Sequence, residues 1–356
     1  MGQTLVIAEK PSVAGDIARA LGGFKKDGDF WVSDAMIVGS AVGHLLEIKA
    51  PEEYDVKRGR WSFANLPVLP PHFDLQPIKK SIKKFEGLEK KIRSRSVTDI
   101  INACDAGREG ELIFRYIIQA TGTKKPIRRL WLQSMTKASI QKAFTALRSD
   151  AEMKPLEAAA RSRSEADWLV GINGTRALTA FNSKDGGFFL TTVGRVQTPT
   201  LAIVVAREEE ITHFKPQNYW EVHTTFGAQA GDYDSVWVDA DFKKTKGQSA
   251  ELKPERLWTA AEAQAIVAKC QGKLGIVTDH KRRATSAPPA LFDLTSLQRE
   301  ANGRFGFPAK MTLAILQRLY ERHKVLTYPR TDSRALPEDY PETMKETLSH
   351  LQKLEA

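Results

Sequence analysis

The sequence predicts a multidomain fold in which a parallel α/β domain precedes helical and β-rich segments. Three observations lead to this prediction. Apolar, β-branched stretches alternate with helical patterns over roughly residues 1–150, which is typical of a parallel sheet covered by helices. Residues 151–215 then carry only helical patterns, and residues 216–280 turn to strand-like ones. Residues 281–356 are helical again after a proline-rich boundary, so we expect four domains with these bounds.

The opening of the chain predicts the first elements of the α/β domain. "TLVIAEK" (4–10) is a short run of apolar and β-branched residues, as in a buried strand. "PSVAGDIARALG" predicts a helix with Pro11 at its start and Gly22 at its end. "KDGDFWVSDAMIVGSAVGHLLEI" (26–48) predicts alternating strands with a turn at its Asp-Gly pair.

The same alternation continues to residue 149. The lysines of residues 78–95 recur with helical spacing, and we interpret them as a solvated helix face rather than a binding patch. "VTDIINACD" (97–105) predicts a buried strand that runs into "AGREG" and the helix "ELIFRYIIQATG". "IRRLWLQS" (127–134) predicts a third strand, and "TKASIQKAFTALRS" (136–149) predicts a helix opened by a threonine cap.

Beyond the α/β domain, the sequence predicts helices, then strands, then helices. The two helical patterns are "KPLEAAARSRSEADWLVGINGTRALTAF" and "TPTLAIVVAREEEITHF". The three predicted strands are "YWEVHTTF", "SVWVDADF" and "LGIVTDH", around one helix near 259–271. Helical patterns then continue to just before Tyr328, and a last polar helix ends at Ala356.

Composition restricts the classes of function. The chain has 53 Lys and Arg against 43 Asp and Glu, and its net charge of +10 attracts polyanions, with nucleic acid first and an anionic membrane surface second. No apolar run approaches the roughly 20 residues that span a bilayer, and the start has no signal-peptide pattern. Cys104 and Cys270 are too few for a disulfide framework or a four-cysteine zinc site. We therefore expect a cytoplasmic protein with no membrane partner.

Acidic residues gather after two of the predicted strands. Glu9 closes the first strand, Asp105 follows a later one, and Glu109 and Glu111 lie within one helical turn beyond it. Open α/β sheets place their sites at the carboxyl ends of strands, and buried carboxylates need cations to neutralise them. Mg²⁺ is usually held by one or two carboxylates with water or phosphate. If the two strands are neighbours, we expect Glu9, Asp105 and Glu109 to bind Mg²⁺, although any single one of them also fits a capped, solvated helix start.

Two further residues are open to alternative interpretations. Proline disfavours the helical conformation for the residue before it, so Tyr328 in "LTYPRTDS" should be extended. Tyr328 fits either an ordinary polar turn or a phenol placed to react with an anionic group. Lys10, next to Glu9, fits either a surface lysine or a group that contacts phosphate and protonates a leaving oxygen.

Taken together, nine segments resemble the type IA DNA topoisomerases, especially the bacterial topoisomerase III branch. In chain order they are "LVIAEKPSVAGDIA", "GHLLEI", "DAGREGE", "RLWLQSMT", "DWLVGINGTRA", "VGRVQTPTLAIV", "LQREANGRFGF", "LQRLYE" and "LTYPRTDS". The resemblance implies a Toprim domain at 1–150, the first part of a helical domain at 151–215, the outgoing segment of a β arch at 216–280, and a truncated helical domain with the active-site tyrosine at 281–356. Members of the family continue further, so the implied toroid is incomplete.

The resemblance also implies a reaction. Tyr328 is the implied nucleophile, which forms a 5′-phosphotyrosine with one DNA strand, so that strand passage and rejoining need no ATP. A phenol has an ordinary pKa of about 10, so a guanidinium and a phosphate-bound Mg²⁺ would have to favour the phenolate. Arg330 is implied to neutralise the scissile phosphate, and Lys10, with Glu9, to stabilise or protonate the 3′ leaving oxygen. No GxxxxGK[ST] phosphate loop occurs in the chain, which agrees with independence from ATP.

Other matching positions imply contacts with DNA. The implied DNA-binding residues are Arg195, Gln197, Arg163, Asp167, Gln317, Glu321 and Thr327. The expected partners are single-stranded DNA and negatively supercoiled or catenated DNA, and we expect a monomer associated with the nucleoid.

Two departures from the family pattern leave alternatives open. The acidic triplet usually reads D-x-D-x-E, but Gly107 replaces its second aspartate, which makes a second Mg²⁺ doubtful unless Glu111 compensates. The chain also stops 28 residues after Tyr328 (356 − 328). A Toprim nuclease, which needs the acids but no tyrosine, and a catalytically impaired fragment that binds single-stranded DNA are therefore the alternative hypotheses.

Overall fold

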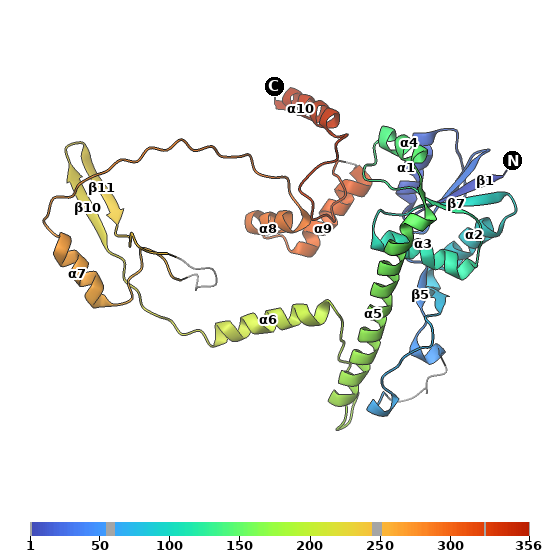
Figure 1. Ribbon diagram of the computed structural model, residues 1–356, viewed down its shortest axis with the longest axis horizontal. Coiled ribbons are helices and arrows are strands. Elements are labelled where there is room, and N and C mark those ends of the chain that lie inside the picture. The colour runs from blue at the N-terminus through green and yellow to red at the C-terminus, as the bar shows by residue number, and fades with distance from the viewer. Residues whose placement is uncertain (1, 55–60, 244–250, 324, 356) are drawn as a thin grey trace. The chain divides into compact units, whose positions relative to one another are not determined.

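The computed structural model describes residues 2–54, 61–243, 251–323 and 325–355 and divides into two compact units (Figure 1). Unit 1 combines Met1–Pro199 with Pro289–Ala356, and unit 2 is Thr200–Pro288. Unit 2 is thus inserted in the sequence of unit 1, which the chain leaves once and re-enters once. Ala356, where the last helix was predicted to end, lies outside the described residues.

A seven-stranded sheet forms the centre of the amino-terminal part of unit 1. Its strands are β1 (Gln3–Ala8), β2 (Lys25–Asp27), β3 (Phe30–Val32), β4 (Met36–Ser40), β7 (Val97–Ala103), β8 (Ile127–Arg129) and β9 (Arg148–Ser149). They lie in the order β2-β3-β4-β1-β7-β8-β9. The four central strands β4, β1, β7 and β8 are parallel, as predicted.

The sheet is mixed, however, so the prediction of a parallel sheet is wrong at its edges. β2 pairs antiparallel with β3, β3 with β4, and β8 with β9. The turn between β2 and β3 contains Gly28, whose φ is +56°. So short a connection can join only antiparallel strands, because a parallel pair needs a long crossover.

Helices cover both faces of this sheet. They are α1 (Pro11–Leu21), α2 (Ile82–Arg93), α3 (Arg108–Thr121) and α4 (Lys137–Thr145). Leu5 and Ile7 of β1 pack into one core with side chains of α2 and α3, whereas Val6 and Ala8 pack into a second core with side chains of α1 and α4. Side chains of a strand alternate between its two faces, so both faces of β1 are apolar and covered.

The capping residues behave as the sequence predicts. Thr136 accepts a hydrogen bond from the Ser139 N–H (3.2 Å) at the start of α4. Gly22 ends α1 with a φ of +75°, a conformation that favours glycine. On α2 the apolar residues Phe85 and Leu88 are buried, as expected for a helix with one solvated face.

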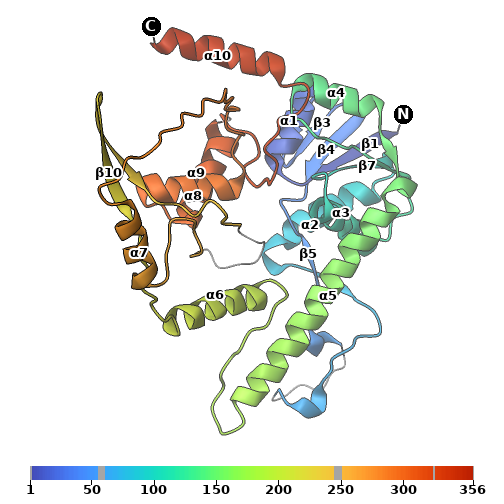
Figure 2. The same cartoon turned by 60° about the vertical axis from the view of Figure 1, so that its left-hand side comes forward.

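A long helix connects the α/β part to the rest of unit 1. It is α5 (Asp150–Asn182), which lies beside α3 in both views (Figures 1 and 2). Arg115 of α3 forms ion pairs with Asp150 (2.7 Å) and Glu157 (3.2 Å) of α5, and the Tyr116 hydroxyl donates to Ser164 (2.9 Å). These contacts fix α5 on the α/β part.

The remaining elements of unit 1 are short or lie near the end of the chain. They are β5 (Leu46–Ile48), η1 (Pro51–Glu53), η2 (Phe63–Asn65), β6 (Leu75–Pro77), η3 (Lys79–Ser81), α8 (Leu294–Phe305), α9 (Ala309–Arg318), the π-helical turn η4 (Leu319–His323) and α10 (Pro341–Glu355). Strands β5 and β6 form a separate antiparallel pair. None of the described helices is long and apolar enough to cross a membrane.

In unit 2, the described residues form one hairpin and one helix, in addition to the helix through which the chain enters this unit. Its elements are α6 (Gln197–Thr212), which begins in unit 1, β10 (His223–Ala228), β11 (Gly231–Val236) and α7 (Ala260–Cys270). The predicted strand "LGIVTDH" (274–280) is wrong, since this segment forms no strand and Leu274 is fully exposed. No described strand pairs with it, and backbone groups without a neighbouring strand cannot form a ladder.

Candidate functional site

Two acidic residues emerge side by side from neighbouring parallel strands. β1 and β7 pair in parallel with Ala8 opposite Ala103, so Glu9 and Asp105 follow at the same edge of the sheet. Burial raises the pKa of the half-buried Glu9, and the negative charge of Asp105 raises it further. Lys10 and a backbone hydrogen bond from Asp105 act in the opposite direction. The adjacency of the two strands, on which the metal prediction depended, is thereby confirmed.

Lys10 lies between one of these acids and Tyr328. Its Nζ is 3.9 Å from Asp105 Oδ2 and 4.9 Å from the centroid of the Tyr328 ring. Tyr328 is 40% exposed, so the phenol remains accessible to a ligand. Unit 1 therefore brings the Tyr328 phenol to an ammonium group and a carboxylate that lie more than 200 residues earlier in the sequence.

Tyr320 completes the surroundings of the phenol and was not predicted. Its ring packs edge-on against the Tyr328 ring, with centroids 5.5 Å apart and planes at 76°. Burial raises the pKa of Tyr320 to about 12, and the charges of Asp105 and Asp16 add to this. Tyr320 therefore stays protonated at neutral pH and acts as a packing partner. It lies in the π-helical turn η4, a distortion that is frequent at functional sites.

The two glutamates of α3 point to different partners. Glu109 Oε2 is exposed and lies 3.3 Å from His44 Nε2. Glu111 is fully buried and accepts hydrogen bonds from Arg115 Nε (2.7 Å) and Asn102 Nδ2 (3.0 Å). Because these partners occupy its oxygens, Glu111 does not take the place of the aspartate that Gly107 replaces.

A buried guanidinium holds the chain at the acidic edge. Arg129 of β8 is 1% exposed, and it donates to the carbonyl oxygens of Asn102 (3.0 Å), Cys104 (2.7 Å) and Asp105 (2.8 Å). Its Nε lies 3.4 Å from Glu111 Oε2. The sequence reasoning missed this role, although an arginine inside an apolar strand pattern must find buried acceptors.

A close approach of the backbone also shapes this edge. A Cβ on Gly110 would lie 2.2 Å from the carbonyl oxygen of Asp105, so only glycine fits there. Gly107, in contrast, has open space around it. A larger side chain is therefore sterically possible at Gly107, so a lack of space does not explain why this position has no carboxylate.

The donor set at this edge fits one Mg²⁺ ion. The described residues contain no cluster of three or more His, Cys, Asp and Glu side chains in position to hold a metal. Glu9 and Asp105 nevertheless repel each other as like charges, and a bound cation would relieve this repulsion. Mg²⁺ needs only one or two carboxylates when water and phosphate complete its coordination.

Three of the predicted DNA-binding residues lie together. Arg195 Nη1 is 3.0 Å from Asp167 Oδ1 and 3.4 Å from the carbonyl oxygen of Arg163. Arg163 Nε is 3.9 Å from Asp167 Oδ2. Asp167 thus holds two guanidinium groups on the surface of α5, where both remain partly exposed. Gln197 follows at the first position of α6 and is exposed.

The other predicted site residues lie on the segment that carries Tyr328. Gln317 lies near the end of α9, Glu321 lies in η4, and Thr327 and Arg330 flank the Tyr-Pro pair. Within the described ranges, these four side chains form no hydrogen bond or ion pair, and Thr327, Glu321 and Arg330 are exposed.

The segment around Tyr328 is anchored at two places that the sequence reasoning missed. Asp339 accepts hydrogen bonds from the hydroxyls of Thr136 (2.7 Å) and Ser134 (2.8 Å), which lower the pKa of Asp339. Arg334 donates to Asp293 (2.9 Å), the capping residue of α8. The quoted segment "RLWLQSMT" contains both hydroxyl donors, but its pattern alone did not indicate a distant partner.

Comparisons with known proteins agree on one family. Residues 151–356 match the sequence profile of a family described as DNA topoisomerase, and residues 4–135 match the Toprim domain. The chain is 42% identical over 354 residues to "DNA topoisomerase 3" of Bacillus licheniformis and 41% identical over 354 residues to that of Bacillus subtilis. Each alignment covers 99% of this chain and 46% of the relative, so the chain spans about half the length of these curated relatives.

A solved structure shares the fold. It is that of full-length topoisomerase I from Thermotoga maritima, with a TM-score of 0.59 and 23% sequence identity. The similarity covers 97% of this chain and 52% of that one. At this identity the comparison supports the arrangement of elements and carries no argument about individual residues.

Proposed function

Because the chain belongs to the bacterial DNA topoisomerase family of type IA, we propose that it cleaves and rejoins one strand of DNA through a 5′-phosphotyrosine at Tyr328. One observation supports this proposal above all others. The Lys10 ammonium lies between the Tyr328 ring and the Asp105 carboxylate. The proposed nucleophile Tyr328, the cation Lys10 and the acid Asp105 are therefore neighbours within unit 1.

In the proposed cleavage step, the Tyr328 oxygen attacks a phosphorus atom of the DNA backbone. The new bond joins this oxygen to phosphorus, and the bond from phosphorus to the 3′ oxygen breaks. The phenol loses a proton, while the 3′ oxygen gains one. The positive charge of Lys10 lies beside the phenol, where it can stabilise negative charge that develops during the attack, and Lys10 can donate a proton to the leaving oxygen.

Other residues assist without forming bonds. Arg330, which has no ion-pair partner in the described part of the chain, is free to neutralise the scissile phosphate. In the metal-free site, Glu9, whose pKa is raised by burial and by Asp105, can pass a proton to the leaving oxygen.

We propose that Glu9 and Asp105 hold Mg²⁺, and that Glu109, whose carboxylate lies 3.3 Å from His44, adds negative charge nearby. Bound there, the ion would supply positive charge that aligns the phosphate with the 3′ hydroxyl for rejoining. The protein's own contribution is to keep the two carboxylates adjacent, and Arg129 does so by holding the carbonyl groups of Cys104 and Asp105.

The proposed substrate is single-stranded DNA, including single-stranded regions of negatively supercoiled or catenated DNA. Its phosphates would contact the exposed guanidinium groups of Arg195 and Arg163, which Asp167 orients, and the strand would continue past Gln197. We propose that the chain acts as a monomer. Binding should favour single strands over intact duplex and weaken steeply with salt, because phosphate contacts release counterions.

The experiment that tests this function is covalent capture. The chain is incubated with end-labelled single-stranded DNA and quenched with denaturant, and a protein–DNA adduct is expected. Tyr328→Phe should abolish the adduct and leave the affinity for single-stranded DNA within about twofold, because it removes only one exposed hydroxyl. An adduct that persists in Tyr328→Phe would contradict the assignment.

The two alternative functions give different results in the same experiment. Metal-dependent cutting that leaves no adduct would indicate a Toprim nuclease. Binding without either cutting or an adduct would indicate a catalytically impaired DNA-binding fragment.

A further inference from the structure

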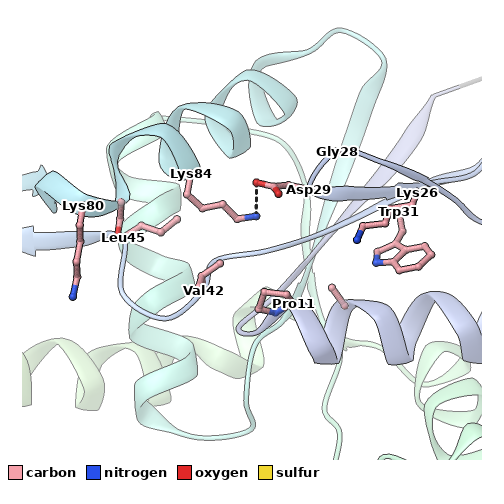
Figure 3. A pocket seen from close by; sticks show the side chains of 11 residues that line it. Pro11, Lys26, Gly28, Asp29, Trp31, Val42, Leu45, Lys80 and Lys84 are labelled. Atoms are coloured by element: carbon pink, nitrogen blue, oxygen red, sulfur yellow. Dashed lines mark hydrogen bonds and ion pairs between the residues drawn. The ribbon is translucent and has the colours of Figure 1, made fainter. Parts of the chain in front are cut away.

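A basic pocket lies next to the candidate active site and has no role in the mechanism above. Its volume is about 330 Å³, and it lies among the β2–β3 hairpin, the start of α1 and the start of α2 (Figure 3). Three lysines line it, Lys26, Lys80 and Lys84, against a single carboxylate, Asp29. The lining therefore carries a net charge of +2 (3 − 1), which suits an anionic ligand.

The charges in this pocket are not all neutralised by one another. Lys84 pairs with Asp29 at 3.1 Å, as the dashed line in Figure 3 marks. Lys26 and Lys80 have no ion pair among the described residues. Lys26 Nζ instead lies 5.8 Å from the centroid of the Trp31 ring. Two ammonium groups thus remain available to a ligand.

The rest of the lining is largely apolar, with Trp31, Val42 and Pro11 among its residues. Val42 is 55% exposed and has a φ of +59°, a conformation that is rare and strained for a β-branched residue. Such strain persists only where the surroundings hold it, and it is concentrated at ligand-binding and active sites. A pocket with an apolar wall and ammonium groups fits a nucleotide, which presents a base face together with a phosphate.

Two backbone connections tie the pocket to the candidate active site. Pro11 directly follows Lys10 in the chain. On the other side of Val42, the Gly43 N–H donates to the carbonyl oxygen of Glu9 (3.2 Å), and the Ala41 N–H donates to that of Ala8 (2.9 Å). The pocket therefore begins at the residues that adjoin Glu9 and Lys10.

We propose that this pocket binds a nucleotide of the single-stranded DNA that flanks the cleaved bond. Its phosphate lies against Lys26 and Lys80, and its base or sugar lies against Trp31 and Val42. The identity of the ligand rests on the proposed function, because a strand held at Lys10 continues past Pro11. Lys80 and Lys84 are then exceptions to the interpretation of the 78–95 lysines as a solvated face.

The test compares two pairs of substitutions that remove the same charge. In the Tyr328→Phe background, which excludes covalent capture, the affinity for single-stranded DNA is measured by fluorescence anisotropy over a range of salt concentrations. Lys26→Gln with Lys80→Gln should weaken binding several-fold and make the slope of log K against log salt shallower by about 0.7 for each phosphate that is no longer neutralised. The control pair, Lys90→Gln with Lys124→Gln, lies on exposed positions outside the pocket and should change the slope far less.

A third substitution predicts an effect of opposite sign. Asp29→Asn removes the one carboxylate among the described lining residues and releases Lys84, so it should tighten binding of single-stranded DNA. Weaker binding by the lysine variant could result from misfolding. Tighter binding by Asp29→Asn could not, so this variant keeps the proposal testable even if the lysine variant loses structure. If the pocket pair behaves as the control pair does, or if Asp29→Asn fails to tighten binding, the proposal is wrong.

The source of the phosphate is tested separately. Inorganic pyrophosphate is titrated calorimetrically into the unchanged chain and into the Lys26→Gln, Lys80→Gln variant. If pyrophosphate binds only the unchanged chain while both proteins bind DNA equally well, the pocket is a site for free phosphate and the proposal is overturned. The covalent adduct assay on the otherwise unchanged chain keeps the two proposals distinct. An adduct with no pocket effect refutes the pocket alone, and a pocket effect with no adduct refutes the proposed cleavage alone.

Discussion

Lys10 has two neighbours, a carboxylate and an aromatic ring, and both attract its positive charge. The Asp105 carboxylate lies 3.9 Å from Lys10 Nζ, and the centroid of the Tyr328 ring lies 4.9 Å from the same atom. A phenolate at Tyr328 would add a second negative charge beside the same group. In the proposed reaction, Lys10 therefore places positive charge beside the phenol and can donate a proton to the 3′ oxygen as that oxygen leaves.

The packing of Tyr320 on Tyr328 gives the first prediction at the scale of single residues. Tyr320→Ala removes the ring that orients the phenol, so the rate of adduct formation should fall by up to about 100-fold, the cost that a small misplacement of a reacting group can carry. Tyr320→Phe keeps the ring and should retain most of the rate. Time courses of covalent capture measure both variants, and equal rates in Tyr320→Ala and the unchanged chain would contradict this role.

The acids at the strand ends give a prediction about metal. Asp105→Asn with Glu109→Gln removes two carboxylates around the proposed Mg²⁺ position, so rejoining should need a higher Mg²⁺ concentration, while cleavage should change less. Decay of preformed adduct during a Mg²⁺ titration measures rejoining. Glu86→Gln with Glu338→Gln removes the same charge from positions outside the site and is the control. An unchanged Mg²⁺ response in the first pair would show that the metal binds elsewhere.

Elements that depend on local pattern were predictable from the sequence. The strands β1 and β7, the helices α1, α3 and α4, and the cap at Thr136 follow from apolar runs, Pro and Gly positions and a capping residue. The antiparallel strand β9 did not follow in the same way, because its two residues lie within the helical pattern predicted for 136–149. The strand expected at 274–280 failed because an apolar pattern cannot reveal whether a partner strand is present.

In the candidate site too, some residues could be placed from the local sequence pattern and others could be identified only from the structure. Glu9 and Asp105 could be placed at one edge because parallel neighbouring strands end together. Tyr320, Arg129 and Asp339 could not be found in this way. Asp339 bonds Ser134 and Thr136, which lie 205 and 203 residues away in sequence. The apolar strand around Arg129 requires buried acceptors for the guanidinium but does not identify them. Tyr320 is close to Tyr328 in sequence, but the helical pattern does not reveal the π-helical turn that packs the two rings together.

The start of α8 gives a prediction about pH. Hydrogen bonds from Ser296, together with Arg334, lower the pKa of Asp293 to about 2, whereas an unfolded aspartate titrates near about 3.9. Since the folded value is the lower one, the ionised carboxylate stabilises the fold above about pH 4, and this contribution is lost as the pH falls from about 4 through about 2.

We expect Asp293→Ala to lower the thermal midpoint of unit 1 at pH 7, and the difference from the unchanged chain should shrink as the pH is lowered toward 3. Asp293→Asn keeps a capping side chain and loses only the charge, so its thermal midpoint at pH 7 should lie between those of the unchanged chain and Asp293→Ala. Thermal unfolding monitored by circular dichroism measures all three. A difference that does not vary with pH would contradict the low pKa.

At the scale of the whole molecule, the chain spans 46% of the length of its DNA topoisomerase 3 relatives. Strand passage requires that both cut ends stay held while a gap opens between them. We predict that a polypeptide of residues 1–356 alone binds and weakly cleaves single-stranded DNA but does not relax negatively supercoiled plasmid. A full-length relative assayed in parallel should relax it and is the positive control. Efficient relaxation by residues 1–356 would show that no further segment is needed.

The insertion of unit 2 into unit 1 has a practical consequence. Glu9, Lys10 and Asp105 precede unit 2 in the chain, whereas Tyr328 follows it, and residues 273–292 between α7 and α8 contain no helix or strand. A single cut in that stretch would leave the acids on one peptide and the phenol on another, joined by contacts such as those of Asp339 with Ser134 and Thr136. The protein could then be reconstituted from two separately expressed pieces, and captured DNA would migrate with the smaller one.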